Sequence, residues 1–270
     1  MNMSGNTSIA PSSGLSRRAS VTTRARPPAP PLALALREGT RKAHRLVESA
    51  SFIQGLLRGV VDRRSYARLL SSLLRVYTAL ERALERHQDH PGVRAIYLPA
   101  LARRHALAQD LAHYDPAGSL LRDPPSPATR AYVARIQQLE REAPELLVGH
   151  AYTRYLGDLS GGRVLRGLVE RVLRPPPGRG LEFYRFPAIA DPVAFKHDYR
   201  ARLDTLGTSR ERVQSIVDEA KQAFAHNHAL FRELEGSALR TVLLLLRSAH
   251  PFRQRLAYAG EDRAPELVHT

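Results

Sequence analysis

The chain has 270 residues, with 41 basic against 26 acidic side chains and a formal net charge of +15. It contains no cysteine, which excludes disulfides, thiolate metal ligands and cysteine nucleophiles. The basic balance indicates an anionic ligand, an acidic protein partner or nucleic acid, and no apolar run approaches the roughly 18 residues of a membrane span, so we expect no membrane anchor.

The two ends of the chain differ from its middle. Residues 1–31 are rich in Ser, Thr, Pro and Arg and contain no acidic residue, which predicts a disordered tail. The same composition resembles an organelle transit peptide, an alternative that stays open beside a cytoplasmic protein with a disordered extension. Residues 249–270 are polar and are predicted to form a flexible C-terminal tail.

Residues 32–248 are predicted to form one all-α domain, because apolar residues recur at helical spacing and no alternating strand pattern interrupts them. Asp191 followed by Pro192 is a typical helix start. Without a domain break, a single multi-helix domain in a monomer is the simplest expectation. The helices are predicted over 32–57, 63–89, 99–113, 127–142, 143–173, from 192 onward and 208–248.

The helix predicted over 143–173 has three glycines at its centre, Gly157, Gly161 and Gly162. Each costs about 1 kcal/mol relative to alanine inside a helix. Such a cost predicts a kink, or a partner that lies against bare backbone. Gly157 and Gly161 share one face, so the pattern fits either a tight crossing of two helices or a flat ligand resting on the backbone.

Polar side chains stand at the same place. Asp158 lies between the glycines, and a carboxylate in an apolar helix midpoint needs partners. Arg154 is one turn earlier and can pair with it directly or through water. His150, two turns before the glycines, is interpreted as a packed or capping histidine.

A second cluster lies in the first helix, where Thr40, His44 and Glu48 share one face. A carboxylate one turn from a histidine orients the ring and raises its basicity, as a metal ligand requires. The alternative is a surface histidine with a carboxylate neighbour. His226 and His228 do not share a helix face, so we discount them as a metal pair.

Basic residues provide a third cluster. Lys196 and Arg200 are one turn apart, and Arg37 lies two turns before His44. Together they can hold carboxylates. The alternative is a solvated basic face.

Two segments resemble the signature motifs of the heme oxygenases. The sequence PELLVGHAYTRYLGDLSGG, residues 144–162, resembles the distal-helix motif of that family, and TRKAHRLVE, residues 40–48, resembles its proximal-helix motif. The likeness continues through YVARIQQLEREAPELL, GLEFYRFP and FKHDYRARL and covers about residues 32–235. It implies an all-α fold that holds heme between a proximal and a kinked distal helix.

The resemblance implies an enzyme that cleaves heme to biliverdin with release of CO and ferrous iron. Heme b is then both cofactor and substrate, and O2 is the co-substrate. Electrons come from a flavoprotein reductase or a ferredoxin, and the net positive charge suits docking of such an acidic donor.

The resemblance also assigns residues. His44 is the axial ligand of the heme iron, with Glu48 beside it. Gly157 and Gly161 let the distal helix lie directly over the porphyrin. Asp158 anchors a distal water network assisted by Tyr77, Tyr132, Arg154 and Asn227. The heme propionates are held by Arg37, Tyr152, Lys196 and Arg200, and the pocket is lined by Phe224 and Phe231.

The chain departs from the family pattern in places. Arg37 stands where lysine is usual in the animal enzymes, which keeps the charge and changes the geometry. The C-terminal membrane anchor of those enzymes is missing, so we expect a soluble, cytoplasmic protein. The arginine-rich tail has no counterpart in the family pattern.

Three other functions are alternatives to this one. A non-catalytic heme-binding or heme-sensing protein of the same fold is the main alternative. The related thiaminase-type fold relies on a cysteine that this chain lacks. Nucleic-acid binding has the charge but no recognised motif or stacking aromatics, so we do not expect it.

Overall fold

Helices account for all the regular structure of the residues that the computed structural model describes, 29–58, 61–206 and 209–234. The α-helices are α1 (Leu32–Glu48), α2 (Ser51–Leu57), α3 (Arg63–Arg86), α4 (Pro91–Arg94), α5 (Arg104–Tyr114), α6 (Ser119–Arg122), α7 (Pro127–Glu142), α8 (Leu147–Ala151), α9 (Gly157–Leu173), α10 (Pro192–Asp204) and α11 (Arg210–Leu234). Short 3-10 turns cover Pro99–Leu101, Pro144–Leu146 and Glu182–Tyr184, and a π-helix covers Tyr152–Leu156. None of the described helices combines the length and apolarity needed to cross a membrane.

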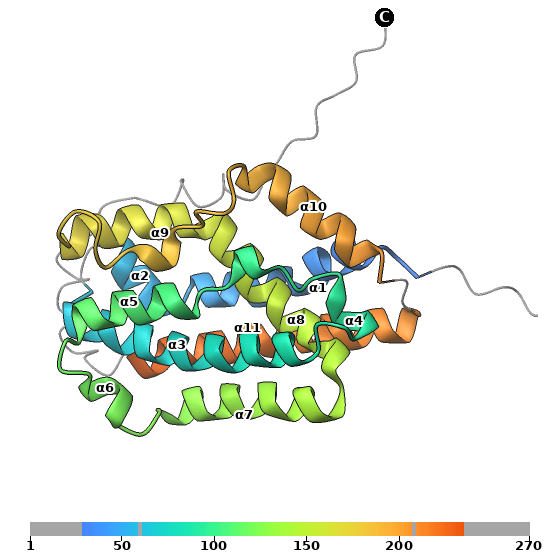
Figure 1. The fold of residues 1–270 in the computed structure, drawn as a ribbon, viewed down its shortest axis with the longest axis horizontal. Helices are drawn as coiled ribbons and strands as arrows, with labels where there is room; N and C mark the ends of the chain where they lie inside the picture. The colour runs from blue at the N-terminus through green and yellow to red at the C-terminus, as the bar shows by residue number, and fades with distance from the viewer. Residues whose placement is uncertain (1–28, 59–60, 207–208, 235–270) are drawn as a thin grey trace, which may run out of the picture.

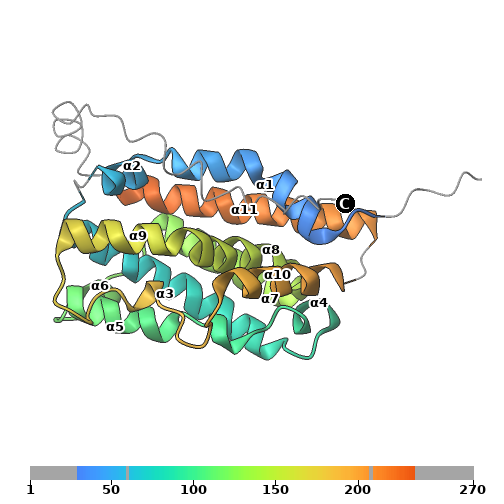
Figure 2. The same ribbon diagram turned by 90° about the horizontal axis from the view of Figure 1, so that it is seen from above.

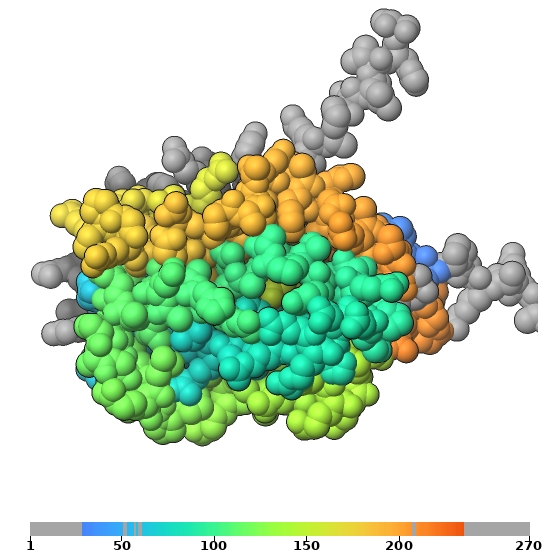
Figure 3. Space-filling view, viewed as in Figure 1, coloured from blue at the N-terminus to red at the C-terminus, as the bar shows by residue number. Residues whose placement is uncertain are grey.

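The long helices pack lengthwise around one core. α1 lies along α11, and α3 packs against α5 on one side and α7 on another (Figures 1 and 2). α11 also contacts α7 and α8, so it links the N-terminal helix to the middle of the chain. In the space-filling view, the segment from α3 to α5 fills the centre of the near face, α9 and α10 lie along its top, and α7 lies along its bottom (Figure 3). The core is rich in leucine and contains fully buried tyrosines.

Helix starts follow local capping chemistry. The side chain of Asp191 accepts hydrogen bonds from the backbone N–H groups of Val193 and Ala194, and Pro192 occupies the first turn. This satisfies backbone donors that the first turn leaves unpaired. The start predicted at Asp191 and Pro192 is therefore confirmed, and the helix predicted over 127–142 has the same bounds in the structure.

Several predicted helices are wrong in extent, and the one predicted over 63–89 ends at Arg86. The helix predicted over 32–57 breaks after Glu48, where the Gln54 side chain donates to the Glu48 carbonyl at 2.8 Å. The helix predicted over 99–113 starts as a 3-10 turn, and α5 begins only at Arg104. Residues 235–248 of the last predicted helix, and nearly all of the two predicted tails, lie outside the described residues.

The glycine-rich stretch is irregular, as predicted, but not at its glycines. The wide π turn over Tyr152–Leu156 comes just before Gly157, whose own φ of −61° and ψ of −48° are ordinary for an α-helix. Single π turns inside α-helices occur frequently at functional sites. The irregularity thus precedes the three central glycines, and of the two alternatives it is the bare backbone that applies to Gly157 and Gly161.

The close helix crossing in this stretch belongs to a different glycine. A Cβ atom added to Gly149 would lie 2.8 Å from the Ala220 nitrogen and 2.9 Å from the Ile216 oxygen, both backbone atoms of α11. At Gly157 and Gly161, an added Cβ would meet no described atom within 4 Å. The tight helix crossing that the sequence allowed at Gly157 and Gly161 thus occurs at Gly149. The backbone of Gly157 and Gly161 is not covered by another described element.

Candidate functional site

Asp158 lies in the first turn of α9 beside a buried polar network. Tyr77 on α3 donates a hydrogen bond to its Oδ2. Arg154 donates from Nε to the Tyr77 oxygen at 3.0 Å, and its Nη2 lies 3.8 Å from Asp158 Oδ1. Arg154 also donates to the Asn227 side-chain oxygen on α11. The structure therefore brings together four residues that the sequence analysis assigned to one network.

Burial controls the charge states in this network. Burial raises the pKa of Asp158 to about 6, although Arg154, the hydrogen bond from Tyr77 and Arg103 all lower it. Burial, with the nearby Asp158 charge, raises the pKa of Tyr77 well above its ordinary value. At neutral pH the phenol is therefore a donor and the carboxylate an acceptor.

Tyr132, predicted to assist the same network, has other partners. Its hydroxyl lies 3.5 Å from His150 Nδ1, and its ring stacks on His226 with 4.8 Å between ring centroids. The pKa of Tyr132 is raised by burial, and the charges of Arg154 and Asp158 act on it in opposite directions. Tyr132 thus faces the distal network without a hydrogen bond to it.

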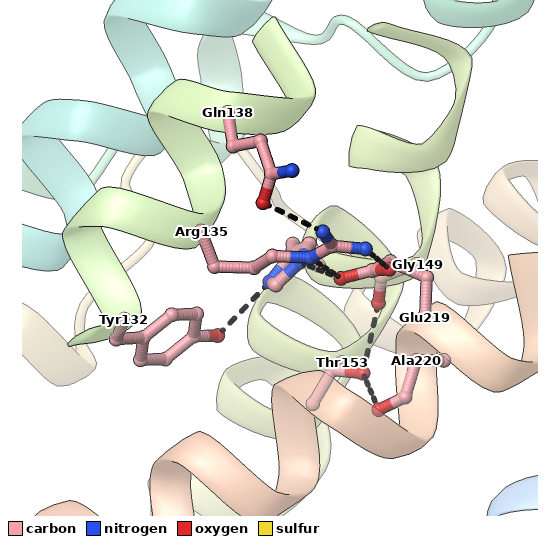
Figure 4. A network of polar contacts seen from close by, with 8 residues as sticks. Tyr132, Arg135, Gln138, Gly149, Thr153, Glu219 and Ala220 are labelled. Atoms are coloured by element: carbon pink, nitrogen blue, oxygen red, sulfur yellow. Dashed lines mark hydrogen bonds and ion pairs between the residues drawn. The ribbon is translucent and has the colours of Figure 1, made fainter. Parts of the chain in front are cut away.

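Behind Tyr132 is a buried ion-pair network that sequence reasoning missed (Figure 4). His150 is fully buried, as a packed histidine, and its Nε2 lies 2.9 Å from Glu219 Oε1. Arg135 donates to both carboxylate oxygens of Glu219, at 3.0 and 2.5 Å. Burial alone would raise the pKa of Glu219, but the hydrogen bonds from His150 and Arg135 lower it to about 2. Arg135 and Glu219 are far apart in sequence, so no local pattern signals their pairing.

His44 projects from α1 with one ring nitrogen engaged. Its Nδ1 lies 3.4 Å from Glu48 Oε1, and its side chain is 55% exposed. Phe224 on α11 packs edge-on against the ring, with 5.6 Å between centroids. Within the described part of the chain Nε2 has no polar partner, so it is available as a ligand atom, and Glu48 lies beside Nδ1.

α11 contacts both the residues around His44 and the residues around Asp158. Phe224, which touches His44, and Asn227, which accepts from Arg154, are three residues apart and share a face of that helix. Phe231, two turns beyond Phe224, is partly buried against the core. The motif on α1 and the π-helix of the second motif therefore converge on one side of α11.

Three of the four predicted carboxylate anchors, Arg37, Tyr152 and Arg200, lie near one another. Asp204 on α10 accepts from the Ala33 backbone at 2.9 Å, which ties α10 to the start of α1. Burial raises the pKa of Tyr152, and Thr40, Arg200 and Arg37 act to lower it, so these side chains lie close to the phenol. Within the described residues, no acidic side chain forms an ion pair with the predicted cations Arg37, Lys196 and Arg200.

These features fit heme on geometric and chemical grounds. The open backbone of Gly157 and Gly161 suits a flat molecule, because a Cβ there would fill free space. His44 offers a free ring nitrogen for iron, and unpaired cations beside Tyr152 suit two propionates. No group of three or more His, Cys, Asp or Glu residues within the described part of the chain is placed to bind a bare metal ion.

Comparison with known proteins gives one consistent result. A family model described as heme oxygenase matches residues 30–233. The heme oxygenase of Porphyra purpurea is 43% identical over 215 residues, which are 80% of this chain and 91% of that protein. The structure of heme oxygenase-1 from the cyanobacterium Synechocystis in complex with heme matches with a TM-score of 0.76 at 41% identity, covering 81% of this chain and 98% of that one. The structure of the heme oxygenase from Leptospira interrogans matches with a TM-score of 0.73 at 41% identity, covering 76% of this chain and 100% of that one.

Proposed function

The chain belongs to the heme oxygenase family, and we infer that it cleaves heme oxidatively to biliverdin, releasing CO and ferrous iron, with O2 as co-substrate. The observation that carries this function is the carboxylate of Asp158, held by Tyr77 and Arg154 beside an open glycine backbone. A protein that only stores or senses heme has no need for a buried carboxylate network at this place, so the network favours the enzyme over the non-catalytic alternative.

On the proximal side, we propose that His44 Nε2 binds the iron. When bound, heme supplies both the redox-active iron and the porphyrin that is cleaved. Glu48, 3.4 Å from Nδ1, orients the imidazole and strengthens it as a ligand. Phe224 limits rotation of the ring by packing against its edge.

On the distal side, the side chains position water. The bare backbone of Gly157 and Gly161 would let a porphyrin lie against α9 without a side chain between them. Tyr77 donates to Oδ2 of Asp158, which leaves Oδ1 to accept a hydrogen bond from water. A water held in this way can donate its other proton toward the reacting oxygen. Arg154 and Asn227 fix the position of Tyr77 and so of the carboxylate.

The basic cluster is proposed to orient the substrate. Arg37, Lys196 and Arg200, with the Tyr152 hydroxyl, would bind the propionates by charge-assisted hydrogen bonds. Fixing the propionates fixes the rotation of the porphyrin about its axis. The position of the anchors would thereby select the porphyrin edge that is cleaved.

The electron donor is proposed to be an acidic flavoprotein reductase or ferredoxin. The net charge of +15 supports this, since complementary charge raises association rates. Turnover with a ferredoxin should slow as ionic strength rises, because salt screens such steering. We further propose that the protein works as a cytoplasmic monomer.

The function is tested with hemin and a reductant in air. We expect the Soret band to disappear and biliverdin absorption to replace it. Asp158→Asn should bind hemin and form much less biliverdin. Asp198→Asn is the matched control, because Asp198 is 58% exposed and pairs with Arg202 on α10. Full biliverdin yield from Asp158→Asn would refute the proposed role of this carboxylate. A Soret band of the wild type that persists without formation of biliverdin would refute the proposed enzyme activity.

A further inference from the structure

We propose that Asp110 is a positioning residue for the reaction: it fixes the turn Glu182–Tyr184, whose central phenylalanine supports the ring of Tyr77. The inference rests on the function proposed above, in which Tyr77 donates a hydrogen bond to the carboxylate of Asp158. Asp110 lies in α5 and belongs to neither of the two family motifs.

Asp110 is a buried carboxylate whose two oxygens both bind the turn. Oδ1 accepts from the backbone N–H of Glu182 and Oδ2 from that of Phe183, each at 2.8 Å. The residue is 0% exposed, and burial raises its pKa to about 6 against the two hydrogen bonds, so the carboxylate is ionised at pH 7. Hydrogen bonds to an ionised acceptor are the stronger class. Because the two donors are consecutive, they fix the orientation of the turn as well as its position.

The turn is enclosed by three helices. Just before it, Gly180 has a φ of 76°, and a Cβ atom added there would lie 2.9 Å from the ring of Tyr114 at the end of α5. Tyr66 of α3 donates to the Tyr184 hydroxyl at 3.2 Å. On α9, a Cβ atom added to Gly162 would lie 3.7 Å from the Tyr184 ring. The turn thus lies between α9 and α5 and also contacts α3 (Figures 1 and 2).

Phe183 carries this fixed position to the distal network. Its ring meets the Tyr77 ring edge to face, with 5.8 Å between centroids and an interplanar angle of 77°. Phe183 is 5% exposed and Tyr77 is 0% exposed, so solvent does not separate the two rings. Arg154 also contacts Tyr77, through its Nε at 3.0 Å from the hydroxyl and its central carbon at 4.9 Å from the ring centre.

The contacts form one continuous path from Asp110 to Asp158. Asp110 holds the backbone of Phe183, Phe183 packs against Tyr77, and the Tyr77 hydroxyl donates to Asp158. A displaced turn would leave space beside the Tyr77 ring, and the ring would carry its hydroxyl away from the carboxylate. Catalytic groups must be held to a fraction of an ångström by the side chains that surround them. Asp110 therefore acts on the reaction through Tyr77 and does not touch the substrate.

The test observes Tyr77 directly in the full heme-free chain. Tyrosine labelled with 13C at Cζ reports the hydrogen bonding of each phenol, and Tyr77→Phe identifies the signal. Asp158→Asn gives the position of the signal when the carboxylate acceptor is lost. D110N keeps the size of the side chain but accepts only one of the two N–H groups, so the Tyr77 signal should move toward its position in Asp158→Asn.

Two further variants separate the proposed path from a general loss of order. F183L keeps the N–H that binds Asp110 but removes the ring, so it should move the Tyr77 signal in the same direction. D191N is the matched control, because Asp191 also accepts from two backbone N–H groups but caps α10, and the signal should stay in place. A shift of equal size in D191N, or no shift in folded F183L, would contradict the proposal.

Turnover gives the second readout. A misplacement of about 1 Å can cost roughly a hundredfold in rate, so a smaller shift of Tyr77 should slow biliverdin formation in D110N and F183L by roughly tenfold. The Kd for hemin should stay unchanged, because neither Asp110 nor Phe183 belongs to the groups proposed to hold heme. A loss of hemin affinity that accounts for the whole loss of rate would contradict the proposal.

An unchanged Tyr77 signal in folded D110N would overturn the inference. If D110N does not fold, F183L takes its place, and an unchanged signal in folded F183L would then overturn it. Failure of the underlying function is distinguishable, because it appears as full biliverdin yield from Asp158→Asn whatever the Tyr77 signal in D110N.

Discussion

The open backbone at Gly157 makes a prediction in which protein stability and heme binding change in opposite directions. A Cβ atom added there meets no described atom within 4 Å, and the backbone is already helical. Alanine is favoured over glycine inside a helix by about 0.8–1 kcal/mol. Gly157→Ala should therefore stabilise the heme-free protein by about that amount, which raises Tm by about 2–4 °C for a domain of this size.

Gly149 supplies the matched control in the same stretch of chain. A Cβ atom there would lie 2.8 Å from the Ala220 nitrogen and 2.9 Å from the Ile216 oxygen, and these backbone atoms cannot move independently of α11. Overpacking of this kind costs about 1–3 kcal/mol, which exceeds the gain in helix propensity. Gly149→Ala should thus lower Tm, although the two substitutions are chemically identical.

A larger side chain at Gly157 tests the ligand. Gly157→Leu places an isobutyl group where the porphyrin is proposed to lie, so the Kd for hemin should rise at least about tenfold, or about 1.4 kcal/mol. The heme-free variant should melt no lower than the wild type. Thermal melts and a Soret titration measure the two effects. Unchanged hemin affinity in Gly157→Leu, or a fall in Tm in Gly157→Ala, would refute the reasoning.

Three further predictions follow from the same structure. His44→Ala should alter the ferric heme spectrum and regain a wild-type-like spectrum with added imidazole; an unaltered spectrum would show that another group binds the iron. Arg200→Ala combined with Lys196→Ala should weaken hemin binding and give a mixture of biliverdin isomers by chromatography, whereas a single isomer at wild-type affinity would argue against propionate binding here. The pKa of Glu219 is about 2 in the folded state against an ordinary 4.5, so its stabilising contribution is complete above pH 4.5 and is lost as pH falls toward 2. The stability difference between wild type and Glu219→Gln in urea should accordingly shrink over that range, and a constant difference would contradict the assignment.

Much of the fold and part of the site follow from short-range sequence patterns. Apolar spacing gives the extent of α7, and Asp191 with Pro192 gives the start of α10, because both depend on neighbours within a turn or two. The spacing of His44 and Glu48 places both on one face of α1, which the structure confirms with a contact of 3.4 Å. The proximity of the predicted network residues came from resemblance to the heme oxygenases, since Tyr77, Arg154 and Asn227 are distant in sequence.

Only the tertiary structure distinguishes the glycines from one another. In sequence, Gly149 and Gly157 are both helical glycines in one apolar stretch, and it is the position of α11 that fills the space beside the first and leaves the second open. The π-helix lies between Gly149, which is packed on α11, and Asp158, which is bonded to α3. Arg103 likewise acquires its place from Arg185 and Phe186, far along the chain. Sequence determines which segments are helical because helix formation is local, whereas these features depend on which remote surfaces meet when the helices pack.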